Sequence, residues 1–236
     1  MLPVKDNILN ARFPFVTIAL IVTNVVVYVL VTGHGGSLIS GPDTHEVLRY
    51  GAIPHAFTNS GHDGAVPTWQ TAFTAMFVHG SVLHLGVNML FLWIFGNTVE
   101  DAIGPVRFFG LYILGGLVAL ALHVVLAPGS LSPTIGATGA IAAVLGGYVV
   151  LYPRARTLTL VFIILFFTVI ELPASVMLGL WFVVQALFAA VGLTNPTGTG
   201  APAAYLSQLG GFIFGALTIR LLATRRKQAP PVRSAL

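Results

Sequence analysis

The chain has 236 residues, of which 56% are hydrophobic and only 8% charged, and its formal net charge is +4. With a mean hydropathy of +0.91 it has too few polar side chains to cover a water-facing surface, which excludes a soluble globular domain. The lack of cysteine excludes disulfides and thiolate metal sites. We therefore expect an all-α integral membrane protein.

Six apolar runs have the length, or nearly the length, of a membrane-spanning helix. A hydrocarbon core of about 30 Å requires about 18–20 helical residues. The predicted spans are residues 13–31, 80–97, 106–126, 138–152, 172–192 and 203–224. They predict one membrane domain, residues 13–224, with a long connection at about 32–78.

The positions of the basic residues predict the orientation of these spans. If the N-terminal residues 1–12 are cytoplasmic, ten of the eleven Lys and Arg residues lie inside and only Arg49 lies outside. We therefore expect residues 1–12 and the basic tail 225–236 to be cytoplasmic and the connection 32–78 to lie outside. The predicted location is the plasma membrane of a prokaryote, with several passes.

The apolar segment 157–170 is not counted as a span. Its 14 residues are too few to cross a membrane, and a seventh span would place the basic C-terminal end outside. We expect a re-entrant or interfacial piece on the cytoplasmic side that protein must cover.

The outer connection carries four histidines at irregular spacing. In a polar loop such residues are expected to be solvated, and they do not form a recognisable ligand pattern for a metal. They are His34, His45, His55 and His62. We expect no metal site and no cofactor.

Small residues recur every four positions in two of the predicted spans. Gly139, Ala143 and Gly147 lie on one face of span 138–152, and Gly211 and Gly215 lie on one face of span 203–224. Such faces let two helix backbones approach closely in lipid. We expect these two spans to be in contact.

Two polar side chains of span 80–97 predict an intramembrane site. His84 and Asn88 are four residues apart, so they share a helix face and can reach one point. Span 138–152 is only about 22 Å long, so Thr138 at its start lies below the outer surface and requires a water-filled cavity. The free N–H groups of a helix start favour a developing oxyanion.

Four stretches resemble the rhomboid intramembrane serine proteases, in order and at suitable spacing. They are HGSVLHLGVNMLFLWIFGNTVED, GATGAIAAVLGGYVVLYPRARTLTL, ELPASVMLGLWFVVQ and LGGFIFG, and the resemblance extends over roughly residues 11–222. It implies a six-helix bundle whose fourth helix starts in an outward-facing cavity. In that family a serine at this start attacks a transmembrane substrate and a histidine on the sixth helix is the base. The resemblance places His84, Asn88 and the Thr138 N–H on the oxyanion side.

Both positions of the family's dyad are substituted in this chain. The family pattern Gly-X-Ser-Gly is Gly136, Ala137, Thr138 and Gly139 here, and Gln208 stands where the histidine is expected, two residues before a Gly-Gly pair. A glutamine amide cannot take up a proton near neutral pH. Losing the nucleophile or base of a soluble serine protease costs on the order of a millionfold in turnover. We therefore expect peptide hydrolysis to be nearly absent.

The substituted residues also have structural interpretations. Thr138 is a good N-cap residue, and this role is favoured over that of a nucleophile. Gln208 is expected to form a hydrogen bond with Thr138 that links the fourth and sixth helices. His84 and Asn88 are better explained by a retained polar cavity than by chance.

Our first functional hypothesis is a rhomboid-fold pseudoprotease that binds transmembrane segments of client proteins within the lipid bilayer and does not bind nucleic acid. The second is an active intramembrane endopeptidase in which Thr138 attacks and His84 or a water chain is the base. A third is an inactivated variant of such a protease. A channel or transporter has the least support, because few ionisable residues lie in any span.

Overall fold

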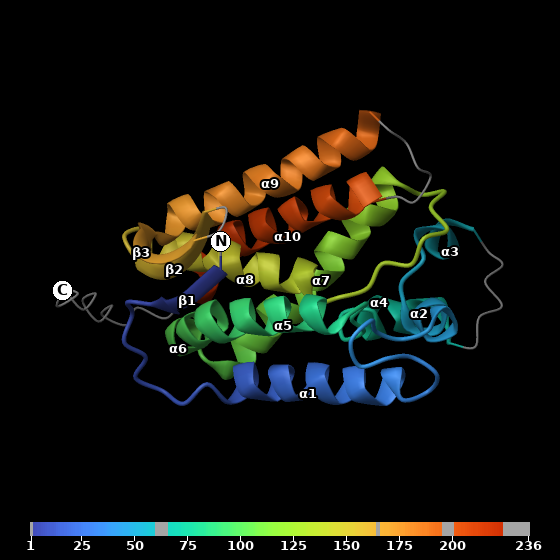
Figure 1. Cartoon of the computed structure of the whole chain (residues 1–236), viewed down its shortest axis with the longest axis horizontal. Helices are drawn as coiled ribbons and strands as arrows, with labels where there is room; N and C mark the ends of the chain where they lie inside the picture. Colours follow the sequence, from blue (N-terminus) through green and yellow to red (C-terminus); the bar gives the residue numbers. More distant parts are fainter. Residues whose placement is uncertain (1, 60–65, 164–165, 195–200, 224–236) are drawn as a thin grey trace.

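Helices packed side by side dominate the computed structural model, which describes residues 2–59, 66–163, 166–194 and 201–223. A small sheet lies at one end of the molecule and the short helices α2, α3 and α4 lie at the other (Figure 1). The elements in chain order are β1 (Leu2–Asp6), α1 (Phe15–Thr32), α2 (Thr44–Tyr50), α3 (Pro54–Thr58), α4 (Thr68–Thr74), α5 (Val82–Phe91), the π-helical segment η1 (Leu92–Gly96), α6 (Asn97–Ile103), α7 (Pro105–Leu126), α8 (Thr138–Leu151), β2 (Arg156–Ile163), β3 (Phe166–Pro173), α9 (Ala174–Thr194) and α10 (Ala201–Leu222).

Helices occupy the six runs that the hydropathy pattern singles out. Among the described residues, four helical stretches are long and apolar enough to cross a membrane, and they are Phe15–Thr32, Val82–Ile103, Pro105–Leu126 and Ala203–Leu222. Thr138–Leu151 and Ala174–Leu187 are shorter apolar helices. The protein is therefore a multi-pass integral membrane protein.

Helix α8 forms the centre of the core. Its residues Ala140–Tyr148 are all buried, and Figure 1 shows it between α10 and α5. A Cβ atom at Gly211 would overlap the carbonyl oxygen of Gly139, and one at Gly215 would overlap that of Ala143. The predicted contact between the two small-residue faces is confirmed, because only glycine permits this backbone approach.

Glu100 of α6 holds the start of α1. Its carboxylate accepts hydrogen bonds from the Val16 N–H at 2.9 Å, the Thr17 N–H at 2.7 Å and the Thr17 hydroxyl at 2.7 Å. These amides have no partner within α1, and a carboxylate also complements the positive end of a helix dipole. The neighbouring Asp101 accepts hydrogen bonds from the N–H groups of Ala11 and Arg12, which precede α1, at an exposed position.

A three-stranded antiparallel sheet in the order β1-β2-β3 corrects the all-α prediction. Strands β2 and β3 pair from Arg156 with Pro173 to Ile163 with Phe166, so segment 157–170 forms most of a β-hairpin. Its re-entrant or interfacial position on the cytoplasmic side stays a prediction. Burial alternates along the start of β2, because Thr157 and Thr159 are buried whereas Leu158 is 37% exposed. This period of two is that of a strand.

Asp6 connects the sheet to the helices through two side-chain hydrogen bonds. Its Oδ2 atom accepts hydrogen bonds from the Thr98 hydroxyl of α6 at 2.9 Å and from the Tyr148 hydroxyl of α8 at 3.1 Å. Burial raises the pKa of Asp6, and the two hydrogen bonds partly offset this rise. One side chain thus links β1 with two helices of the core.

Replacing Glu100 tests whether its carboxylate stabilises the start of α1. Glu100 is only 3% exposed, so Glu100→Ala leaves three donors without their acceptor. We expect the free energy of unfolding to fall by about 3 kcal/mol, measured by equilibrium denaturation in mixed detergent micelles. The matched variant Asp101→Ala removes bonds that water can replace and is expected to cost about 1 kcal/mol. Equal losses in the two variants would contradict this role of Glu100.

Candidate functional site

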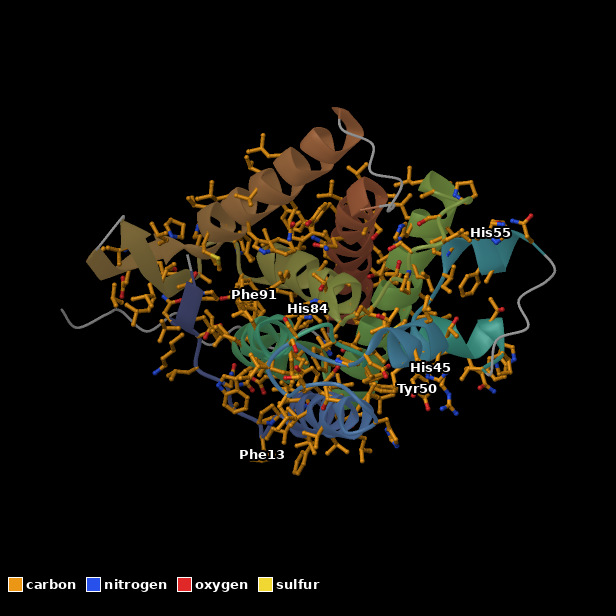
Figure 2. All side chains as sticks on the ribbon, turned by 45° about the vertical axis from the view of Figure 1, so that its right-hand side comes forward. Phe13, His45, Tyr50, His55, His84 and Phe91 are labelled. Carbon is orange, nitrogen blue, oxygen red and sulfur yellow. The ribbon has the colours of Figure 1, made fainter. Side chains whose placement is uncertain are left out.

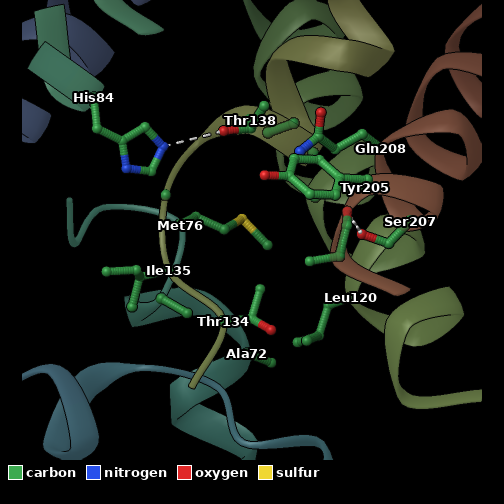
Figure 3. A pocket seen from close by; sticks show the side chains of 16 residues that line it. Ala72, Met76, His84, Leu120, Thr134, Ile135, Thr138, Tyr205, Ser207 and Gln208 are labelled. Carbon is green, nitrogen blue, oxygen red and sulfur yellow. Dashed lines mark hydrogen bonds between the residues drawn. The ribbon is translucent and has the colours of Figure 1, made fainter. Parts of the chain in front are cut away.

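A cavity of about 330 Å³ lies at the start of α8. Residues of α4, α5, α7, α8 and α10 line it together with the loop that precedes α8, so five helices meet there (Figure 3). The residues His84, Thr138 and Gln208, which the sequence singles out, all line this cavity.

Gly136 shapes the loop that leads into α8. Its φ of +105° lies in the left-handed region, and its N–H donates to the Ala75 carbonyl at 2.8 Å. A Cβ atom at this position would lie 2.7 Å from Cε1 and 2.9 Å from Nε2 of His84. Glycine is therefore required both for the turn and for the position of the His84 ring.

Thr138 is the first residue of α8, and its hydroxyl faces α5. The Oγ1 atom donates to Asn88 Oδ1 at 3.4 Å and lies 3.4 Å from His84 Nε2. The N-cap residue is Ala137, and no side chain caps this helix. The predicted N-cap role of Thr138 is wrong, because the turn at Gly136 starts the helix one residue earlier and directs the hydroxyl away from the N–H groups of α8.

Helix α5 brings His84 and Asn88 to the same atom. Ser81 precedes this helix and accepts a hydrogen bond from the His84 N–H at 3.1 Å, which fixes the helix start. His84 and Asn88 follow on one face, one turn apart, and both reach the Thr138 hydroxyl as their spacing predicts. Both distances to that hydroxyl are longer than usual, because a hydrogen bond between two oxygens measures about 2.5–3.0 Å and one between nitrogen and oxygen about 2.7–3.2 Å.

Among the residues that the structure describes, His84 has aromatic and hydroxyl neighbours. Within the described residues, no carboxylate forms a hydrogen bond with it, and its ring packs edge-to-face on His79 with 5.1 Å between centroids. His79 donates from Nδ1 to the Phe77 carbonyl at 3.2 Å. Burial, with the nearby His84 adding to the effect, lowers the pKa of His79 to about 4, so this ring is neutral at physiological pH.

Gln208 enters the cavity from α10, and Figure 3 shows it and His84 to either side of Thr138. Its Oε1 atom is buried and has no hydrogen-bond partner among the residues that the structure describes. The predicted hydrogen bond between Gln208 and Thr138 is therefore wrong, because the Thr138 hydroxyl is directed toward α5 instead.

Sequence reasoning missed two other residues of α10 that line the cavity, Tyr205 and Ser207. Tyr205 precedes Gln208 by three positions, so it lies on the same helix face. This spacing, applied to Gln208, is the signal that could have identified Tyr205.

The outer histidines that the structure describes, His34, His45 and His55, do not line this cavity. Figure 2 shows His84 among the helices, whereas His45 and His55 lie on the peripheral helices α2 and α3. In the described part of the chain, no group of three His, Asp or Glu side chains could hold a metal ion. His62 and the basic tail 225–236 lie outside the described residues.

Comparison with known proteins identifies the family. A family profile described as the rhomboid domain matches residues 67–225, which is more than half of the chain. The chain belongs to the rhomboid family. The resemblance found in its four sequence stretches is therefore confirmed, and one similar protein is named as a rhomboid protease.

Similar proteins occur in bacteria and in mitochondria. The chain is 39% identical over 90 residues to Rhomboid protein 1, mitochondrial, of Saccharomyces cerevisiae, a match that spans 36% of this chain and 26% of that protein. It is 37% identical over 82 residues to Presenilin-associated rhomboid-like protein A, mitochondrial, of Danio rerio, a match that spans 34% of this chain and 21% of that protein. It is 29% identical over 143 residues to Rhomboid protease GluP of Bacillus subtilis, a match that spans 60% of this chain and 26% of that protein. The matches thus span about a quarter of the length of these relatives.

Replacing Gly136 tests how the cavity is built. Gly136→Ala places a methyl group against His84 on a residue whose φ is +105°, which is unfavourable for alanine. We therefore expect the free energy of unfolding, measured by detergent denaturation, to fall by about 3 kcal/mol. Gly86→Ala on the exposed face of α5 meets no atom within 4 Å and is expected to be neutral or stabilising by up to about 1 kcal/mol. A neutral Gly136→Ala variant would contradict the fit of His84 against the loop.

Proposed function

We propose that this protein binds transmembrane segments of client proteins in the cavity at the start of α8 and does not hydrolyse them. One observation carries the proposal: the Thr138 hydroxyl faces His84 and Asn88, whereas Gln208 occupies the side of the cavity where the family resemblance expects the base. The cavity and its polar walls are retained, while the group that would accept the hydroxyl proton is an amide.

The chemistry of hydrolysis explains why this arrangement does not cut. A hydroxyl nucleophile must transfer its proton to a base as it attacks. Gln208 cannot accept that proton. His84 has no carboxylate partner in the described structure, and its ring neighbour His79 is neutral. An imidazolium at His84 would therefore form in buried surroundings without compensation.

Six spans with both termini in the cytoplasm form the proposed topology. The uneven distribution of Lys and Arg supports it. Helix α8, with 14 residues, is about 21 Å long, so a start below the outer surface is consistent with its polar cavity. We place the protein in the plasma membrane of a prokaryote, which the extent of the match to the Bacillus subtilis relative supports.

A second candidate function is intramembrane proteolysis with Thr138 as nucleophile and His84 as base. The distance of 3.4 Å between His84 Nε2 and Thr138 Oγ1 favours it, because such contacts often shorten when substrate binds. Against it, the same ring lies beside Asn88 on the oxyanion side, and a protonated His84 would lack a counter-charge.

A fluorescent single-span peptide with a Gly-Ala-Gly stretch near its outer end separates the two candidates. We expect the purified protein to bind this peptide saturably in micelles, by fluorescence anisotropy, and to leave it intact in a cleavage assay. The double variant Thr138→Ser/Gln208→His regains a nucleophile and a base, so we expect it to cleave at least about a hundredfold above the background rate.

Thr138→Ala is the control for both measurements. It is expected to match the wild-type protein in the cleavage assay, because neither has a competent nucleophile. Cleavage by the wild-type protein that disappears in Thr138→Ala would establish the second candidate. A lack of peptide binding would overturn the proposed client binding.

A further inference from the structure

A second cavity, of about 390 Å³, lies beside the C-terminal half of α1. It is bounded by α1, α2 and α4, and Figure 1 shows α2 and α4 near the end of α1. Most of its wall is apolar, and Val27, Val31 and Phe77 contribute to it. Among the described residues, none lines both this cavity and the one at the start of α8.

The α1 wall of this cavity continues into the apolar outer surface of the helix. Leu30 lines the cavity and is 59% exposed, and its neighbours Val26 and Val29 are exposed as well. In a bilayer, acyl chains cover such a surface of a spanning helix, because lipid tails are as apolar as leucine. The cavity is therefore next to lipid along α1.

The dimensions of the cavity suit an acyl chain. Its α1 wall extends from Thr23 to Val31, about 12 Å, which is most of one leaflet of a hydrocarbon core about 30 Å thick. In the proposed topology this is the outer leaflet, because α1 begins on the cytoplasmic side. A helix about 10 Å across fills a comparable volume in about one turn, so the cavity is too small for a client helix.

One acidic side chain interrupts the apolar wall. Glu46 of α2 lines the cavity and is only 6% exposed. Its Oε1 atom lies 3.3 Å from Nδ1 of His45 and 3.9 Å from Nη1 of Arg49, whereas within the described residues no hydrogen bond is found for Oε2. A buried carboxylate requires hydrogen bonds and a counter-charge. A ligand with a charged N–H donor complements it.

Arg49 places a positive charge next to this carboxylate. Its guanidinium lies over the ring of Tyr50, 5.1 Å from the centroid, and Tyr50 also lines the cavity. The Arg49 side chain is 40% exposed, so it is accessible to a phosphate group. A carboxylate beside a guanidinium complements a headgroup that carries both an ammonium and a phosphate.

We propose that this cavity binds one acyl chain of a phospholipid with an ethanolamine headgroup, whose ammonium donates to Glu46 and whose phosphate binds Arg49. A choline headgroup has no N–H to donate, and a glycerol headgroup has no positive charge, so the carboxylate selects ethanolamine. This inference uses the proposed topology and is independent of client binding at the start of α8.

Native mass spectrometry of the intact, delipidated protein tests the headgroup preference. The protein is mixed with equal amounts of dioleoyl phosphatidylethanolamine, phosphatidylcholine and phosphatidylglycerol. We expect phosphatidylethanolamine to be the first lipid bound, with about a tenfold preference over each of the others. Glu46→Gln removes the charge, so we expect the preference to fall to about twofold or less. Glu171→Gln on β3, at the other end of the molecule, is the matched control and is expected to keep it.

A second pair of variants tests the position of the acyl chain without a change of charge. Val27→Trp fills the cavity, so we expect the protein to lose the first bound lipid whatever its headgroup. Val26→Trp places the same side chain on the exposed face of α1, outside the cavity, and is expected to bind lipid as the wild-type protein does.

Three results would overturn the inference. The first is the absence of a headgroup preference in the wild-type protein, or an equal preference in Glu46→Gln. The second is unchanged lipid binding in Val27→Trp, which would place the bound lipid elsewhere. The third is a Val27→Trp variant that binds lipid normally and no longer binds the single-span peptide, which would assign this cavity to a client. Peptide binding by the wild-type protein is measured separately, so failure of the lipid proposal leaves the proposed function standing.

Discussion

The hydroxyl of Thr138 lies between His84 and Asn88 at the start of a buried helix, and the rest of the structure serves to hold it there. Both contacts measure 3.4 Å. They exist because α8 begins within the bundle and because Gly136 turns the chain at a φ that other residues rarely adopt. The fold therefore holds a polar site at the start of α8.

The packing around α8 explains why such a site is tolerated inside a membrane protein. Glycines on α10 bring its backbone against α8, and Glu100 satisfies the free amides of α1 with three hydrogen bonds. Asp6 joins the sheet to α6 and α8. These contacts satisfy backbone and side-chain groups that lipid could not, and their stabilisation offsets the cost of a cavity with an unpaired polar atom.

Sequence patterns predicted the helices and the common face of His84 and Asn88, because apolar length and a spacing of four are local properties. They failed where three-dimensional context decides. The apolar run after α8 forms strands because its residues 157–160 pair with β1 at the N-terminal end of the chain, far away in sequence. The direction of the Thr138 hydroxyl depends on the turn at Gly136, and the position of Gln208 depends on how α10 packs, so neither could be read from spacing.

We propose that this site retains a hydroxyl without an effective base. A fluorophosphonate probe reacts with a hydroxyl that an adjacent base activates, and mass spectrometry of the intact protein and its peptides locates the adduct. We expect the wild-type protein to remain unlabelled under conditions in which Thr138→Ser/Gln208→His is labelled at position 138. A phosphonyl adduct on Thr138 of the wild-type protein would show that an effective base is present.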